Sequence, residues 1–156
     1  MAVTKLRDEI KQQKPFASLE QEAMLSIERT AAVIGHGFAD ALKPFGVTPT
    51  QYNVLRILRG AGGSGLCRNE VSERLVAQVP DVTRLLDRME EAGLILRERD
   101  TIDRRLVTTR ITAAGLRLLR EMEVPVAEMH DRQLGHLSRS QLKTLIELLA
   151  LARSPG

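Results

Sequence analysis

The chain has 156 residues, of which 43% are apolar, 28% charged and 3% aromatic, with 23 basic and 20 acidic side chains. A chain of this length and composition can bury one core, so global disorder is excluded and a single domain spanning residues 1–156 is expected. The lone cysteine, Cys67, excludes a disulfide framework within the chain and a multi-cysteine zinc site. Neither a secretory signal nor a run of about 20 apolar residues is present, so we expect a cytoplasmic protein without membrane contacts.

The N-terminal part predicts one long amphipathic helix. Apolar residues recur at intervals of three or four between about Ser18 and Lys43, as they do along one face of a helix. The charged segment 4–14, which ends at Pro15, predicts a short additional helix or an arm.

Three further helices are expected in the middle of the chain. Thr48-Pro49-Thr50-Gln51 combines an N-cap, a proline at the first helical position and a glutamine that can close a capping box, so a second helix should begin there and end at Gly60. A third helix is expected over about 68–77 and a fourth from near Pro80 to Gly93, which together make a helix-turn-helix candidate. The residues expected on the buried side of the fourth helix are Val82, Leu85, Leu86, Met89 and Ala92.

After Gly93 the pattern changes to that of a β-hairpin. Residues 94–99 and 106–111 are β-branched or alternating, and the polar stretch 100–105 between them predicts the hairpin tip. Thr112 is then expected to cap a fifth helix, and Ser138 with Gln141 a sixth.

The last helix indicates how the chain assembles. Its apolar residues cover roughly 220° of the helix circumference, well above the stripe of about 100° that one core-facing side needs. A homodimer interface built from both ends of the chain is therefore favoured over a helix surrounded within the monomer. These apolar residues are Leu142, Leu145, Ile146, Leu148, Leu149, Leu151 and Ala152.

The outward side of the fourth helix is suited to reading DNA. It carries Thr83, Arg84 and Asp87, with Arg88 at its flank, and an arginine fork can donate two hydrogen bonds to guanine in the major groove. The alternative is a set of solvated charges paired along the helix. The hairpin favours the DNA interpretation, because its tip holds Asp103, Arg104 and Arg105, and an arginine on such a projection can enter a minor groove.

The segment from Val79 to Thr112 resembles the recognition helix and wing of the MarR (multiple-antibiotic-resistance regulator) family. Their wing signature, D-x-R followed five residues later by L-T, is matched by Asp103, Arg105, Ile111 and Thr112, with isoleucine in place of leucine. The resemblance implies a mainly α fold with a small β-hairpin wing. It places a winged helix-turn-helix lobe at residues 46–112 and dimerisation helices at residues 1–45 and 113–156.

The resemblance further implies a homodimer that binds a pseudopalindromic operator in double-stranded DNA, and a repressor that responds to a small phenolic or lipophilic effector. Repression or activation, and the existence of any effector, stay open at this point. The implied DNA-binding residues, among which Asp103 would orient Arg105, are Arg68, Arg74, Pro80, Thr83, Arg84, Asp87, Arg88, Asp103, Arg104 and Arg105. The residues near the implied effector crevice are Arg29, His36, Phe45 and Tyr52.

Charge within the implied DNA-binding segment is balanced, with nine basic and nine acidic residues over 68–112. The hairpin region 94–112, by contrast, holds five arginines and three acids. DNA binding should therefore depend on salt with a moderate slope, because phosphate contacts release counterions.

Several other motifs are weaker. Gly60, Gly62 and Gly65 spell G-x-G-x-x-G, but a nicotinamide-binding enzyme needs a preceding strand where a helix is expected, so the loop is interpreted as a flexible connector. Cys67 lies before a helix, where a thiol is activated, which leaves a redox-responsive regulator as an alternative to a plain small residue.

No catalytic, metal-binding or cofactor-binding group of residues is recognisable. The three histidines have no ligand spacing and are expected at surfaces or interfaces. Few aromatic side chains are available to stack on single-stranded nucleic acid. The protein is therefore not expected to be an enzyme, and a helical interaction module that does not bind DNA is the remaining alternative.

Overall fold

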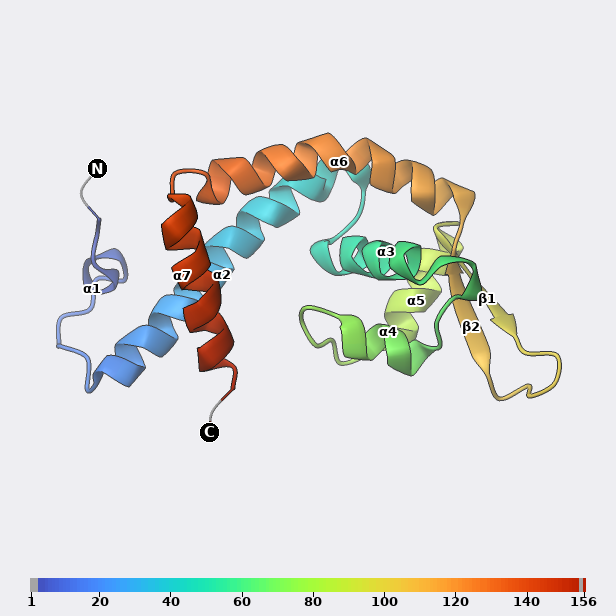
Figure 1. Ribbon diagram of the computed structural model, residues 1–156, viewed down its shortest axis with the longest axis horizontal. Helices are drawn as coiled ribbons and strands as arrows, with labels where there is room; N and C mark the ends of the chain where they lie inside the picture. Colours follow the sequence, from blue (N-terminus) through green and yellow to red (C-terminus); the bar gives the residue numbers. More distant parts are fainter. Residues whose placement is uncertain (1–2, 155) are drawn as a thin grey trace. The chain divides into compact units, whose positions relative to one another are not determined.

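The computed structural model describes residues 3–154 and 156 and divides the chain into two compact units, Met1–Gly37 and Phe38–Gly156 (Figure 1). The first unit contains α1 (Leu6–Glu9) and most of α2 (Leu19–Leu42), which confirms the predicted long helix and the short helix before it. No helix in the described residues is long and apolar enough to cross a membrane.

The second unit holds the other elements, and the predicted helices and the hairpin are confirmed. They are η1 (Lys43–Phe45), α3 (Pro49–Ala61), η2 (Gly62–Ser64), α4 (Arg68–Arg74), α5 (Val82–Glu91), β1 (Ile95–Arg99), β2 (Val107–Ile111), α6 (Ala113–Leu134) and α7 (Arg139–Ala152).

Three predicted caps start helices where the sequence places them. Thr48 accepts a hydrogen bond from the amide of Gln51 at 3.2 Å, and the Gln51 side chain accepts one from the Thr48 amide at 3.0 Å. Ser138 forms the same capping box at the start of α7. The Thr112 hydroxyl accepts from the Gly115 amide and donates to the carbonyl of Gly93, so it joins α6 to the end of the helix-turn-helix.

The core of the second unit lies between α3, α5, α6 and the hairpin. Side chains that are fully buried there include Leu55, Leu58, Val71, Leu86, Met89, Ile95, Leu119 and Met122. The expectation that Ala92 is buried is wrong: it is exposed because α5 ends at Glu91 and Ala92 forms its C-cap.

The turn between α4 and α5 is longer than predicted. Helix α4 ends at Arg74 rather than near residue 77, because Leu75 takes up an extended backbone and turns its side chain into the core. The amide of Val76 is then held by the side-chain oxygen of Asn53 at 2.9 Å. Asp81 caps α5, which begins two residues after Pro80.

The glycine-rich segment does not form the open connector that the sequence predicts: its residues end α3, form η2 and lead directly to a bridge between Leu66 and the hairpin. Leu66 forms an antiparallel bridge with Thr109, with N···O distances of 3.0 and 2.7 Å in the two directions. β1 and β2 pair antiparallel from Ile95 opposite Ile111 to Arg99 opposite Val107. The hairpin is thereby fixed to the segment that leads into α4.

Candidate nucleic-acid interface

Helix α5 presents one buried and one exposed side. Leu86 and Met89 anchor it in the core, and the Asp81 carboxylate accepts a hydrogen bond from the amide of Arg84 at 2.9 Å. Because these contacts fix the rotation of the helix, the side chains of Thr83, Arg84 and Arg88 face outward and are exposed.

Helix α4 contributes basic groups beside α5. Its first residue, Arg68, donates a hydrogen bond to the hydroxyl of Thr83 at 3.1 Å, so two predicted site residues from different helices are in contact. Arg74 lies at the other end of α4 and is exposed, as is Pro80 in the turn.

Asp87 is bound within the protein rather than left on the outward face. Arg97 of β1 donates to the Asp87 carboxylate at 2.5 Å and to that of Glu90 at 3.0 Å. The hydrogen bonds from the side chain and the amide of Arg97 lower the pKa of Glu90. The Glu90 carboxylate therefore stays ionised and bound to the hairpin at neutral pH.

The hairpin tip is ordered by two aspartates. The Asp100 carboxylate accepts from the amides of Ile102 and Asp103, at 2.7 and 2.9 Å. The Asp103 carboxylate accepts from the Nε of Arg105 at 3.1 Å and from its Nη2 at 3.3 Å. The Arg105 side chain is 91% exposed, and its guanidinium is paired with Asp103. Arg104 is also exposed, and its carbonyl accepts a hydrogen bond from Arg99.

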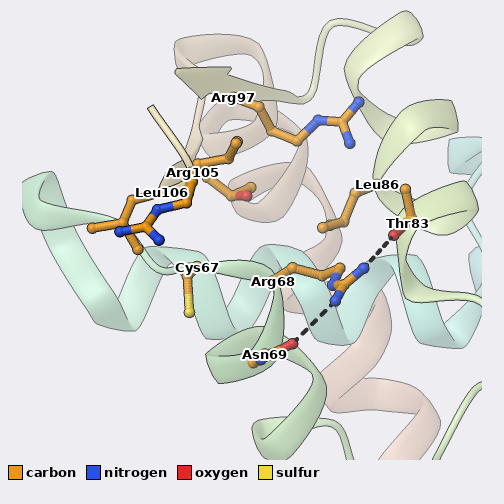
Figure 2. Close-up of a pocket in the computed structure, with 10 residues that line it drawn as sticks. Cys67, Arg68, Asn69, Thr83, Leu86, Arg97, Arg105 and Leu106 are labelled. Atoms are coloured by element: carbon orange, nitrogen blue, oxygen red, sulfur yellow. Dashed lines mark hydrogen bonds between the residues drawn. The ribbon is translucent and has the colours of Figure 1, made fainter. Parts of the chain in front are cut away.

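A hollow of about 420 Å³ lies between α4, α5 and the hairpin, and Figure 2 shows the side chains that line it. Arg68 reaches across to Thr83, and Arg97 points toward α5, whereas Arg105 extends from the hairpin beside Leu106. Predicted DNA-binding residues of the three elements thus share one concave surface.

The residues predicted for an effector crevice lie in both units. In the first unit, Arg29 is ion-paired with Glu9 at 3.7 Å and His36 is exposed on α2. In the second unit, Tyr52 packs edge-on against Phe38, with ring centroids 5.4 Å apart, and Phe45 packs against the core. A shared crevice stays a prediction.

Cys67 is the N-cap residue of α4, as the sequence indicates. Its amide donates to the Glu70 carboxylate at 2.8 Å, and this hydrogen bond lowers the pKa of Glu70. The thiol is half-buried and lines the hollow described above. Among the described residues, no three His, Cys, Asp or Glu side chains are grouped so that they could hold a metal ion.

Sequence reasoning missed two features of this site. Asp100 has a local signal, because an aspartate that opens a turn commonly accepts backbone amides two and three residues ahead. The contacts of Arg97 with Asp87 and Glu90 have no local signal in the sequence, since they depend on how α5 and β1 pack together.

Comparison with known proteins identifies this arrangement. The MarR family model matches residues 47–107. The uncharacterized HTH-type transcriptional regulator YkoM of Bacillus subtilis (strain 168) is 30% identical over 142 residues, which cover 88% of this chain and 90% of YkoM. A MarR transcription factor from Planctomyces limnophilus has a solved structure with 41% identity and a TM-score of 0.68, covering 88% of this chain and 99% of the other.

A third comparison concerns fold alone. BpsR of Bordetella bronchiseptica, solved in work on the regulation of its DNA binding by 6-hydroxynicotinic acid, has 22% identity and a TM-score of 0.78, covering 92% of this chain and all of BpsR. Together the family model, the sequence identity and the winged helix fold exclude the nicotinamide-binding enzyme, since the segment before Gly60 is helical. The chain belongs to the MarR family of DNA-binding transcriptional regulators.

Proposed function

We propose that the protein binds a pseudopalindromic operator as a homodimer and represses transcription from it. Residues 46–112 form the DNA-binding lobe, and residues 1–45 and 113–156 supply the dimerisation helices. In each protomer α5 enters a major groove, and the hairpin places Arg105 in the adjacent minor groove. Two such lobes then contact half-sites about one helical turn, ~34–36 Å, apart.

The orientation of Arg105 is the observation that carries the proposal. An exposed arginine ordinarily samples many rotamers, and fixing it on binding costs up to about 2 kcal/mol of side-chain entropy. Here the Asp103 carboxylate already holds the guanidinium while 91% of the side chain stays open to solvent. A side chain ordered without being buried is suited to a narrow, negatively charged groove.

The exposed face of α5 supports a contact with base edges. Arg84 and Thr83 lie in the first turn of the helix, at the end that a recognition helix directs into the major groove. Two of the three acids farther along the same helix, Asp87 and Glu90, are bound by Arg97, so they do not face the phosphates as free charges. Arg68, Arg74 and Arg104, with Arg88 beside them, supply the phosphate contacts.

Helix α7 supports a homodimer. None of its residues is buried, and its apolar side chains remain exposed to an extent unusual for a soluble surface, with Ile146 at 65% and Leu151 at 71%. A contiguous apolar patch on a helix marks an interaction surface. A second copy of the chain covers it, in keeping with the pseudopalindrome.

We further propose that a small phenolic or lipophilic effector releases the protein from DNA. BpsR has a similar fold, and its DNA binding is regulated by 6-hydroxynicotinic acid, which is a small hydroxylated aromatic acid. An effector can act only if it binds the DNA-free arrangement of the dimer more tightly than the DNA-bound one. Arg29, His36, Phe45 and Tyr52 are the candidate contacts.

The proposal is tested with duplexes selected from random DNA by the purified protein. An inverted repeat should emerge. Arg84→Ala should relax the preference at one base pair of each half-site, worth about 1–3 kcal/mol of discrimination. Arg105→Ala should weaken binding by roughly tenfold for all sequences while sedimentation still shows a dimer. Arg120→Ala, an exposed arginine on α6, is the matched control and should bind as the parent does.

Two outcomes would contradict the proposal. If Arg84→Ala and Arg105→Ala bind the selected duplex as tightly as Arg120→Ala does, the assigned DNA-binding face is wrong. If the parent protein retains no duplex even at low salt, a helical interaction module replaces the regulator.

A further inference from the structure

We infer that Arg97 is a positioning residue that holds the hairpin against α5, so that Arg84 and Arg105 can contact one duplex at the same time. The inference rests on the proposed DNA binding and adds to it a residue that need not touch DNA. Its side chain is only 21% exposed, against 91% for Arg105, because it is directed at α5 and away from the hairpin tip.

Arg97 makes a denser set of contacts than any other arginine of the hairpin. Its Nη2 donates to Asp87 at 2.5 Å and to Glu90 at 3.0 Å, and its Nε donates to the same Glu90 oxygen at 3.3 Å. The Arg97 amide donates to the second oxygen of Glu90 at 2.8 Å. The two carboxylates are three residues apart, on one face of α5, so a single guanidinium binds the recognition helix at two points slightly less than one turn apart.

The position of Arg97 in the sheet allows these contacts to join the hairpin to α5. It stands in the middle of β1, opposite Thr109, whose side chain is 1% exposed and whose backbone bridges to Leu66. Neighbouring strand residues point to opposite faces, and on the other face Arg110 binds Glu98 and the carbonyl of Gly63, both at 2.8 Å. One arginine thus joins the hairpin to α5, and the other joins it to the glycine-rich loop.

Simple geometry indicates what would follow if the contact with α5 were lost. Five-residue strands extend about 16 Å at about 3.3 Å per residue, so a tilt of about 10° at the base moves the tip by roughly 3 Å. A minor groove is only about 6 Å wide. A displacement of this size takes Arg105 out of the groove while α5 remains in the neighbouring major groove.

The test is a double-mutant cycle that uses the selected duplex and the variants Arg97→Gln and Arg105→Ala. In the parent background Arg105→Ala should weaken binding roughly tenfold, but in the Arg97→Gln background by less than about threefold, because the tip no longer reaches its groove. Hydroxyl-radical protection of the minor groove should disappear in Arg97→Gln, while protection of guanine N7 in the major groove persists.

Arg110→Gln is the matched control, since it removes an arginine of similar contacts from the opposite face of the same hairpin. In that background Arg105→Ala should keep its tenfold effect and the minor-groove footprint should persist. If Arg97→Gln lowers the melting temperature too far for measurement, Glu90→Ala removes the contacts of Arg97 with Glu90 from the helix side, leaves the one with Asp87, and should shift the cycle in the same direction.

The inference is overturned if the effects of Arg97→Gln and Arg105→Ala multiply independently, or if Arg110→Gln gives the same non-additivity. Either result makes Arg97 a structural residue like its neighbours. These outcomes require that the parent protein binds the duplex and that Arg105→Ala weakens it. Failure of that first step contradicts the proposed function instead.

Discussion

Asp100 and Asp103 have different roles at the hairpin tip. Asp100 binds backbone amides and shapes the turn, whereas Asp103 binds the side chain and amide of Arg105. Both pKa values are lowered, but for Asp100 the cause is the amides of Asp103 and Ile102, and for Asp103 it is chiefly the side chain of Arg105. The orientation of Arg105 therefore depends on a carboxylate that is ionised.

This difference gives a prediction for single residues. In an NMR titration the pKa of Asp103 should lie below the ordinary value of about 3.9, and in Arg105→Ala it should return toward that value. Because the folded-state pKa is depressed, the stabilisation from this contact is complete above the ordinary pKa and is lost as the pH falls through the folded-state value. Binding at neutral pH is thus unaffected by the titration.

Asp100 serves as the internal control in the same spectra. Its pKa should stay depressed in Arg105→Ala, since its partners are backbone amides. A return of both aspartates to ordinary values would mean that the substitution disorders the whole tip, which would contradict the assigned role of Asp103.

At the scale of elements, the sequence predicts helix starts well because their signals are local. Thr48, Thr112 and Ser138 each cap the helix that follows, and each cap involves residues within four positions. The end of α4 was misplaced because a tertiary contact, the burial of Leu75, overrides the helical pattern. The contacts of Arg97 escaped prediction for the same reason.

The glycine-rich loop is a second case in which a tertiary contact cannot be predicted from the local sequence. Its glycines predict a flexible connector, yet Gly65 has φ +66°, and a Cβ there would lie 2.6 Å from both the Thr108 side chain and the carbonyl of Thr109. The glycine is needed because Leu66 must come close enough to pair with the hairpin. Only the sheet partner, more than 40 positions away, reveals this.

A pair of glycine substitutions tests this role of the loop. Gly65→Ala should lower the free energy of unfolding by about 2–3 kcal/mol, from backbone strain and the close contacts. Gly60→Ala should leave it unchanged or raise it by up to about 1 kcal/mol, since Gly60 is helical and open space surrounds its Cα. Chemical denaturation measures both. Equal effects would contradict the close approach of Leu66 to Thr109.

At the scale of the whole molecule, the position of the charged side chains matters more than their net charge. The segment 68–112 is neutral by count, but its acids are largely engaged: Asp87 and Glu90 by Arg97, Asp103 by Arg105, and Glu98 by Arg110. Of the exposed arginines, Arg68 of α4 and Arg105 of the hairpin tip line the same hollow, to which α5 contributes Thr83 and Leu86. Net charge alone therefore does not describe how charge is arranged on this surface.

The salt dependence of DNA binding tests both which arginines contact phosphates and how many protomers bind. If Arg68, Arg74, Arg88 and Arg104 of two protomers each neutralise one phosphate, the logarithm of the binding constant should fall against the logarithm of salt concentration with a slope of about −7. Arg74→Ala removes one contact per protomer, so it should reduce the magnitude of the slope by about 2 for a dimer but only about 1 for a monomer. Fluorescence anisotropy on the selected duplex gives both slopes, and Arg120→Ala should leave the slope unchanged. A slope that Arg74→Ala does not alter would remove α4 from the phosphate contacts, and a change of about 1 would contradict the homodimer on DNA.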